Sequence, residues 1–200
     1  MKTFISFLST ALMPIFVLSG CSEFLDPDGV DFDLTDSGKV ISSSEVSLKK
    51  FNSNVVGYGW KCVDFRDIKN DGSLLSHEDS IQDGWGPSDY FFDETTVTSF
   101  FDVMVWLKRC YSTNSYRFED STIHIGSNND NDIRLLKLSD SKFTCISRIG
   151  WKYSDSGKDK DLIPHYMYFK YKKMTDKELQ EHRDKYTTDF ASLYDRDSQE

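Results

Sequence analysis

The sequence is poor in the residue types from which metal and redox centres are built. It has four cysteines and four histidines among 200 residues, and no two of them stand at Cys-x-x-Cys or His-x-x-x-His spacing. It also lacks a Gly-x-Ser-x-Gly turn, a glycine-rich phosphate loop and a His-Glu-x-x-His motif. We therefore predict a protein that is not an enzyme and that holds neither a metal nor a cofactor.

Positive charge is scarce as well. The 24 lysines and arginines are outnumbered by 33 aspartates and glutamates, which gives a formal net charge of −9. No basic stripe is visible along the chain, and this argues against a nucleic-acid partner and against electrostatic adhesion to anionic lipid. Aromatic residues are plentiful, with 10 Tyr, 15 Phe and 4 Trp. This composition is typical of a folded domain.

Long apolar runs are absent after the first residues. The run at residues 4–18 is interrupted by Pro14 and is shorter than the roughly 20 residues that a membrane-spanning helix needs. Lys2 precedes it, and the small residues Ser19 and Gly20 follow it. A basic start, an apolar middle and small residues before a cleavage site predict that residues 1–20 are an export signal peptide.

The step Leu18-Ser19-Gly20-Cys21 resembles the lipobox of bacterial lipoproteins. The resemblance implies a diacylglyceryl group on the Cys21 thiol, cleavage before it and acylation of the new amino terminus. Stable anchoring takes two or more acyl chains, and these modifications would supply them. The resemblance thus implies an outer-membrane lipoprotein of a Gram-negative bacterium, facing the periplasm or the cell surface. The alternative is an ordinary secretory signal in which the cysteine occurs by chance.

Residues 21–44 are rich in aspartate and show little periodicity, so we predict a flexible acidic tether. Acidic residues soon after the lipidated cysteine also resemble the surface-export signal of Bacteroidetes lipoproteins. Residues 45–200 then form one domain. Its three cysteines, Cys62, Cys110 and Cys145, could form one disulfide in an exported protein. The sequence leaves all three pairings open, beside the alternative of buried free thiols.

From about residue 55 onwards, short runs of β-branched and aromatic residues alternate with Asp, Asn, Ser and Gly clusters, at a spacing of about ten residues. This pattern predicts an antiparallel barrel or sandwich. Ile123 and Ile125 should share one face of a strand, opposite His124. The same alternation places four residues on one face of a later strand: Phe143, Cys145, Ile149 and Trp151.

Two short helices should flank these strands. Residues 42–51 offer serines as N-cap and a few apolar positions. Thr175 and Glu178 form a capping box, from which we predict a helix over residues 175–194. Residues 96–107 fit both the helical and the strand period, and their aromatic and β-branched content favours a strand.

This layout resembles the lipocalin-like lipoproteins of Bacteroidetes over roughly residues 45–175. The local match is VVGYGWKCVDF, in which Gly57, Gly59 and Trp60 lie near the position of the lipocalin Gly-x-Trp motif. The last strand, HYMYFKYKK, has lysines where lipocalins stack an arginine on that tryptophan. The resemblance implies a mainly β fold, an up-and-down barrel of about eight antiparallel strands with short N-terminal and C-terminal helices. Its interior is either filled by side chains or holds one small ligand.

Aromatic side chains are the candidate ligand contacts. Trp60, Tyr166 and Phe169 could line the barrel, whereas Trp85 lies between two glycines in a loop where no strand core requires it. Core packing is the alternative for the strand aromatics, because half of them point inward in any barrel. His165 could point inward with Met167 and Phe169, but a histidine at the rim of the barrel with its hydrogen bonds already satisfied is the better interpretation.

These observations favour a non-catalytic, lipid-anchored envelope protein that binds a small hydrophobic ligand in the barrel or a partner protein at its open end. One alternative is a structural or assembly lipoprotein with a filled barrel that acts through its outer surface. Another is an envelope hydrolase, in which carboxylates or a His–Cys pair would have to converge in one cleft. Asn128, Asp130 and Asp132 have the spacing of a calcium loop, but Ile133 stands where glycine is needed, so a polar hairpin loop is the better interpretation.

Overall fold

The computed structural model describes residues 45–69, 72–76, 80, 87–103, 107–126, 132–153 and 162–193. The expected signal peptide, the acidic tether, the lipidation site Cys21 and the loop residue Trp85 lie outside these residues. Within the described residues, no helix has both the length and the apolar character that crossing a membrane requires.

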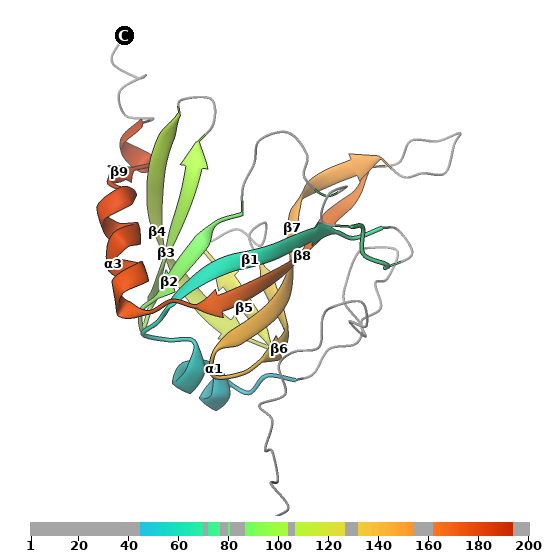
Figure 1. Ribbon diagram of the computed structural model, residues 1–200. Coiled ribbons are helices and arrows are strands. Elements are labelled where there is room, and N and C mark those ends of the chain that lie inside the picture. Colours follow the sequence, from blue (N-terminus) through green and yellow to red (C-terminus); the bar gives the residue numbers. More distant parts are fainter. Residues whose placement is uncertain are drawn as a thin grey trace, which may run out of the picture.

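Eight strands of the described chain form a closed, antiparallel, up-and-down barrel (Figure 1). They are β1 (Gly59–Asp67), β2 (Asp89–Phe92), β3 (Thr96–Val103), β4 (Lys108–Glu119), β5 (Thr122–Ile125), β6 (Ile133–Leu138), β7 (Lys142–Tyr153) and β8 (Leu162–Lys173). Each strand pairs with its neighbours in sequence, and pairing of β1 with β8 closes the ring. The predicted fold is therefore confirmed, and the segment that fitted both periods is a strand as far as Val103.

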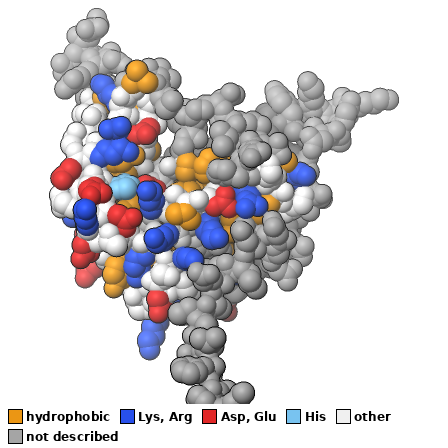
Figure 2. Space-filling model, viewed as in Figure 1, with side chains coloured by type: hydrophobic (Ala, Val, Ile, Leu, Met, Phe, Trp, Pro, Cys, Tyr) orange, Lys and Arg blue, Asp and Glu red, His pale blue; other side chains and the backbone are white. Residues whose placement is uncertain are grey.

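Helix α3 (Asp176–Lys185) lies against the outside of the barrel, beside β2 and β3 (Figure 1). It begins at the predicted capping box, because Glu178 N–H donates to Thr175 Oγ1 at 3.2 Å and Thr175 N–H donates to Glu178 Oε2 at 2.8 Å. Acidic and basic side chains alternate over this helix at the surface (Figure 2).

The predicted extent of this helix, to residue 194, is wrong. The helix ends at Lys185, and the chain then forms β9 (Thr188–Asp189), which pairs in parallel with β4 at Cys110 and Tyr111. Phe190 N–H donates to Tyr111 O at 2.9 Å. Residues 108–115 of β4 pair with β3 along one edge, whereas β5 pairs only with residues 116–119. The other edge of residues 108–115 therefore offers backbone hydrogen-bonding groups to the segment after α3, and these compete with continuation of the helix.

Helix α1 (Leu48–Asn54) closes one end of the barrel (Figure 1). Ser47 caps it, accepting a hydrogen bond from Lys50 N–H at 3.3 Å. Phe51 is fully buried, and its ring stacks on Phe118 with the centroids 4.2 Å apart. Burial of such a side chain stabilises the fold by about 2 kcal/mol, so this packing, more than helix propensity, holds a helix of only seven residues in place.

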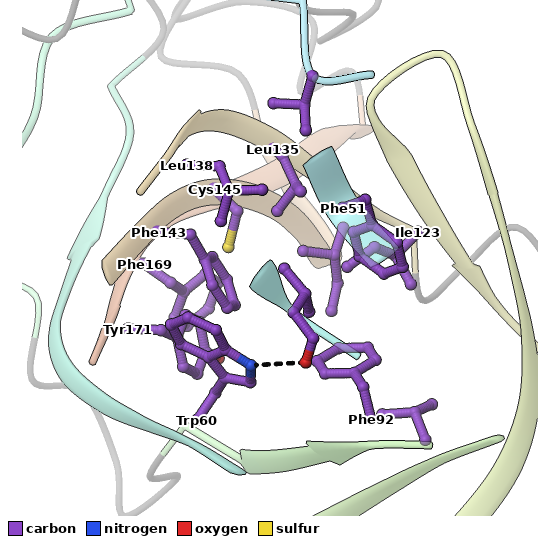
Figure 3. Packing of buried hydrophobic residues seen from close by; sticks show 14 of the residues in the cluster. Phe51, Trp60, Phe92, Ile123, Leu135, Leu138, Phe143, Cys145, Phe169 and Tyr171 are labelled. Carbon is purple, nitrogen blue, oxygen red and sulfur yellow. Dashed lines mark hydrogen bonds between the residues drawn. The ribbon is translucent and has the colours of Figure 1, made fainter. Parts of the chain in front are cut away.

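The barrel interior next to α1 is a continuous apolar core. Figure 3 shows Trp60, Phe143 and Tyr171 gathered on one side of it and Phe51 and Phe92 on the other. The centroids of Trp60 and Phe143 lie 4.8 Å apart, and those of Phe51 and Phe92 lie 6.1 Å apart in an edge-to-face contact. The half of the barrel near α1 is therefore filled by side chains.

Gly59 and Trp60 lie at the start of β1, at this closed end. Trp60 has no exposed surface, and its indole N–H donates to Val55 O at 3.2 Å. Lys173, directly opposite Trp60 on β8, holds its ammonium 5.5 Å from the Trp60 ring and 3.5 Å from the Tyr58 ring. Lys173 thus takes the cation–π position on the tryptophan for which the resemblance implied an arginine.

Alternation along the strands holds until a β-bulge interrupts it. Ile123 and Ile125 are buried in the core and His124 is on the opposite face, as predicted. Ile149 was expected on the same face as Phe143, but it is 51% exposed. A register shift between Arg148 and Gly150 inserts a residue there, and one inserted residue turns the following side chains to the other face.

The three described cysteines are free thiols. Cys62 on β1 and Cys145 on β7 flank β8 and are opposite different residues of it, Tyr171 and Phe169. Two strand spacings alone put their Cα atoms at least roughly 9 Å apart, beyond the reach of a disulfide. Cys110 lies in a separate cluster with Val103 and Leu193. Of the two possibilities that the sequence left open, the structure has free thiols, with Cys110 and Cys145 buried and Cys62 half-buried.

Candidate functional site

The candidate site lies at the end of the barrel opposite α1, which we call the mouth. Here β1 ends at Asp67 and β8 begins close to His165. His165 Nε2 and Asp67 Oδ1 are 2.5 Å apart. The Asp67 side chain is 10% exposed and that of His165 is 23% exposed, so the pair is largely removed from water but still reached by it.

Strand register places both side chains on the inner face of the barrel. Across β1 and β8, Phe65 is opposite Phe169, and Asp67 is opposite Met167. Phe169 and Met167 belong to the core, so this face is the interior. His165 lies two residues before Met167 on β8 and therefore shares its face.

A turn after β1 fixes the backbone of Asp67. Its N–H donates to Ser80 Oγ at 2.9 Å, and its carbonyl accepts from Leu75 N–H at 2.9 Å. Ser80 Oγ in turn donates to Ser76 O at 2.8 Å. The Ser80 hydroxyl proton is thus directed at a carbonyl rather than at His165, and the arrangement is not that of a serine nucleophile with its base.

The chemistry of the pair follows from its orientation. A carboxylate only accepts hydrogen bonds, so His165 Nε2 carries the proton and donates to Asp67. His165 Nδ1 has no partner among the described residues, and it can accept from a ligand, or donate to one when the ring is charged. Beneath it lie apolar side chains, Met167 and Phe169. An apolar floor with one oriented polar group is the usual composition of a small-molecule site.

The other two described histidines also contact aspartates, but outside the barrel. His182 on α3 lies 2.7 Å from Asp89, and His124 lies 2.9 Å from Asp132 on the outer face of β5. Among the histidines that the structure describes, His165 alone faces the interior. No group of three or more potential metal-ligating side chains occurs in the described part of the chain.

Ionisable groups deeper in the barrel are kept neutral. Burial raises the pKa of the Cys62 and Cys145 thiols above the usual value of 9.0. It likewise raises the pKa of the Tyr90 and Tyr171 hydroxyls above 10.0. A thiol with a raised pKa is a poor nucleophile, so the interior below the mouth behaves as packing rather than as reactive chemistry.

The structure separates the aromatic residues that the sequence offered as ligand contacts. Phe169 faces the interior below the mouth and is 8% exposed. Trp60 is in the closed-end core and has no surface to offer, so we correct its assignment from ligand contact to core. Tyr166 points outward and packs on a small external cluster with Ile68 and Tyr168, so it too is not an interior contact. Trp85 lies outside the described residues.

Sequence reasoning missed Asp67, because 98 residues separate it from His165. The available signal was strand alternation: His165, Met167 and Phe169 occupy alternate positions and so share one face of the strand. No protein-family model, curated protein or solved structure matches the chain.

Proposed function

We propose that the protein is a non-catalytic binding protein of the cell envelope, which holds a small amphipathic ligand at the mouth of its barrel. The observation that carries the proposal is the inward-facing His165–Asp67 pair above the apolar floor of Met167 and Phe169. The resemblance of residues 18–21 to a lipobox supports the further proposal that this binding takes place at the outer membrane.

The ligand would be mostly apolar, with one polar group that meets His165 Nδ1. Its apolar part would replace water over Phe65, Met167 and Phe169. Since the core next to α1 is filled, the ligand would enter only the mouth and not the full depth of the barrel. Asp67 would orient the imidazole, so its effect on affinity is indirect.

The test uses protein isolated without detergent from the envelope of an expressing cell. Native mass spectrometry should show a discrete added mass of small-molecule size. The protein stripped of this ligand should then enhance the fluorescence of anilinonaphthalene sulfonate, a probe with an apolar ring system and one anionic group. We expect His165→Ala to lower probe affinity about tenfold, because a hydrogen bond to an oriented imidazole contributes about 1–2 kcal/mol.

His124→Ala is the matched control, since it removes an aspartate-paired histidine from the outer face. It should leave both the added mass and the probe affinity unchanged. If neither an added mass nor probe binding is found, or if both variants behave alike, the binding proposal fails. The filled-barrel, structural alternative would then take its place.

A further inference from the structure

Five lysines gather on the outer surface of β1, β8, β7 and β6. Two rows can be traced through the strand register, and one runs from Lys61 through Lys172 to Lys142. The other includes Lys170 and Lys137, on either side of Thr144. Along each strand these lysines are next to residues that point into the core, such as Trp60, Phe143 and Tyr171, so all five lysines point outward. Figure 2 shows basic side chains collected across the middle of the view, over β1 and β8. We call this surface the lysine face.

The first row opposes like charges directly. Lys61 is the register partner of Lys172, and Lys172 is the register partner of Lys142. Directly opposite side chains start from Cβ atoms about 5 Å apart, and like charges at that separation destabilise a sheet. None of these three lysines has an ion pair with another described residue. The row therefore concentrates positive charge at the surface, which a neighbouring carboxylate, Glu178, offsets only in part.

One carboxylate, that of Glu178, lies close to the first row of lysines. Glu178 lies near Lys61 and Lys172, but its carboxylate accepts the two capping-box hydrogen bonds from Thr175. The pKa of Glu178 is lowered first by those hydrogen bonds and then by the two lysines.

The shape of the lysine face indicates the kind of anion that it fits. Four adjacent strands span about 14 Å, so the amines are dispersed and do not converge on one small anion. Thr144, between Lys170 and Lys137, is itself buried, so the second row flanks a covered strip of the sheet. Lysine is a point charge without the fork that arginine uses to read phosphate or base edges. Val63, which is 51% exposed, interrupts β1 on this side at a bulge and adds apolar surface. Dispersed ammonium groups around an apolar side chain suit a lipid surface with anionic headgroups.

The net negative charge of the chain does not prevent such binding. At physiological ionic strength, charges more than about 8 Å away are largely screened. The contact is then governed by the local lysines rather than by the total of −9. We propose that the lysine face binds membranes through anionic phospholipid headgroups, so that the barrel rests with Lys61, Lys142 and Lys172 towards the lipid surface. This proposal is independent of ligand binding at the mouth and of lipidation at Cys21.

The test uses residues 22–200, which contain every described element and lack the expected signal peptide and lipidated cysteine. We would measure co-sedimentation with phosphatidylcholine vesicles and with vesicles that also contain phosphatidylglycerol. Binding should require phosphatidylglycerol and decrease with added salt. The variant K61Q/K142Q/K172Q should lower the partition coefficient about 100-fold, because each lysine near such a surface contributes about fivefold.

The control K49Q/K108Q/K177Q makes the same change in net charge at exposed lysines elsewhere and should bind almost as wild type. Thermal unfolding of K61Q/K142Q/K172Q should occur no lower than wild type, since like-charge repulsion is removed. Equal binding to both vesicle types, or equal loss in the two variants, would overturn the proposal. So would tighter binding to a single-stranded oligonucleotide, or binding of free glycerol phosphate without binding of vesicles.

Discussion

Asp89 links the first strand of the barrel to the last helix through its two carboxylate oxygens. Oδ1 accepts from Cys62 N–H at 2.7 Å, at the bulge in β1, and Oδ2 lies 2.7 Å from His182 Nε2 on α3. His182 Nδ1 lies 2.9 Å from Glu178 O, so both ring nitrogens face acceptors. One side chain at the start of β2 therefore fixes a bulge and docks a helix.

Asp89→Ala should destabilise the protein by about 2–4 kcal/mol, because it leaves both the Cys62 N–H and the His182 ring without their acceptor. His182→Ala should cost less, about 1–2 kcal/mol. The double variant should lose clearly less than the sum, which urea unfolding of all four proteins would measure. Asp184→Ala, an exposed carboxylate change on the same helix, is the control. Additive losses would show that the two residues do not act together.

Gly59 allows α3 and the end of β8 to approach β1. A Cβ atom at this position would lie 3.0 Å from Leu179 Cδ1 and 3.0 Å from Met174 Sδ. Gly59→Ala should therefore cost about 1–3 kcal/mol through overpacking. The double variant G59A/L179A should recover part of that loss relative to L179A alone, as measured by urea unfolding. If G59A is as stable as wild type, close packing of α3 does not depend on this glycine.

Stability should fall at alkaline pH. Burial raises the folded-state pKa of Cys62, Cys145, Tyr90 and Tyr171, so they keep their protons above the pH at which the unfolded chain loses them. Their stabilising contribution is complete below the unfolded-state values of 9.0 and 10.0 and is lost as pH rises above them. Each such group should lower the unfolding free energy by about 1.4 kcal/mol per pH unit.

Urea unfolding between about pH 8 and pH 11 would measure this slope. Tyr171→Phe should make the slope shallower, since it removes one of the titrating groups. Lys173 acts in the opposite direction, because burial lowers its pKa and stability then rises with pH in the same range. It is one group against four, so the net change remains a loss. A stability that stays level up to pH 11 would contradict the assignment of buried neutral groups.

Cys21→Ala should release the protein from the membrane if the resemblance to a lipobox holds. An acyl chain contributes about 0.8 kcal/mol per buried methylene, and no lipid can be attached without the thiol. Fractionation of an expressing cell in high salt would check this, because salt removes electrostatic adhesion through the lysine face. Retention of the variant at the membrane under these conditions would contradict lipid anchoring.

The sequence was sufficient for the strands but not for what their pairing brings together. Alternation identified Ile123 and Ile125 as core, and the capping box located the start of α3, since both signals depend on neighbours in the chain. The bulge at Gly150 has no such signal, and it reversed the expected orientation of Ile149. The helix was overextended because the competing edge of β4 belongs to a distant segment.

The candidate sites depend even more on contacts between segments that are distant in the sequence. The sequence left open whether His165 points inward, and Asp67 could be assigned as its partner only from the pairing of β1 with β8. The lysine face was invisible as a stripe because its members are distributed over residues 61–172. Trp60 was offered as a ligand contact with core packing as the alternative, and the choice between the two depends on burial, which the sequence does not determine.

Pairing of β1 with β8 has a consequence for how this protein is made. Every other strand pair of the barrel joins strands that follow one another in the sequence, so these hairpins can form as the chain emerges. The pairing of β1 with β8 can form only after residues 162–173 have been made. Until then β1 is an open edge to which a strand of another chain could pair. Asp67 lies on β1 and His165 lies on β8. The candidate site at the mouth therefore forms only in a molecule whose folding is complete, because a barrel that lacks β8 does not bring Asp67 and His165 together.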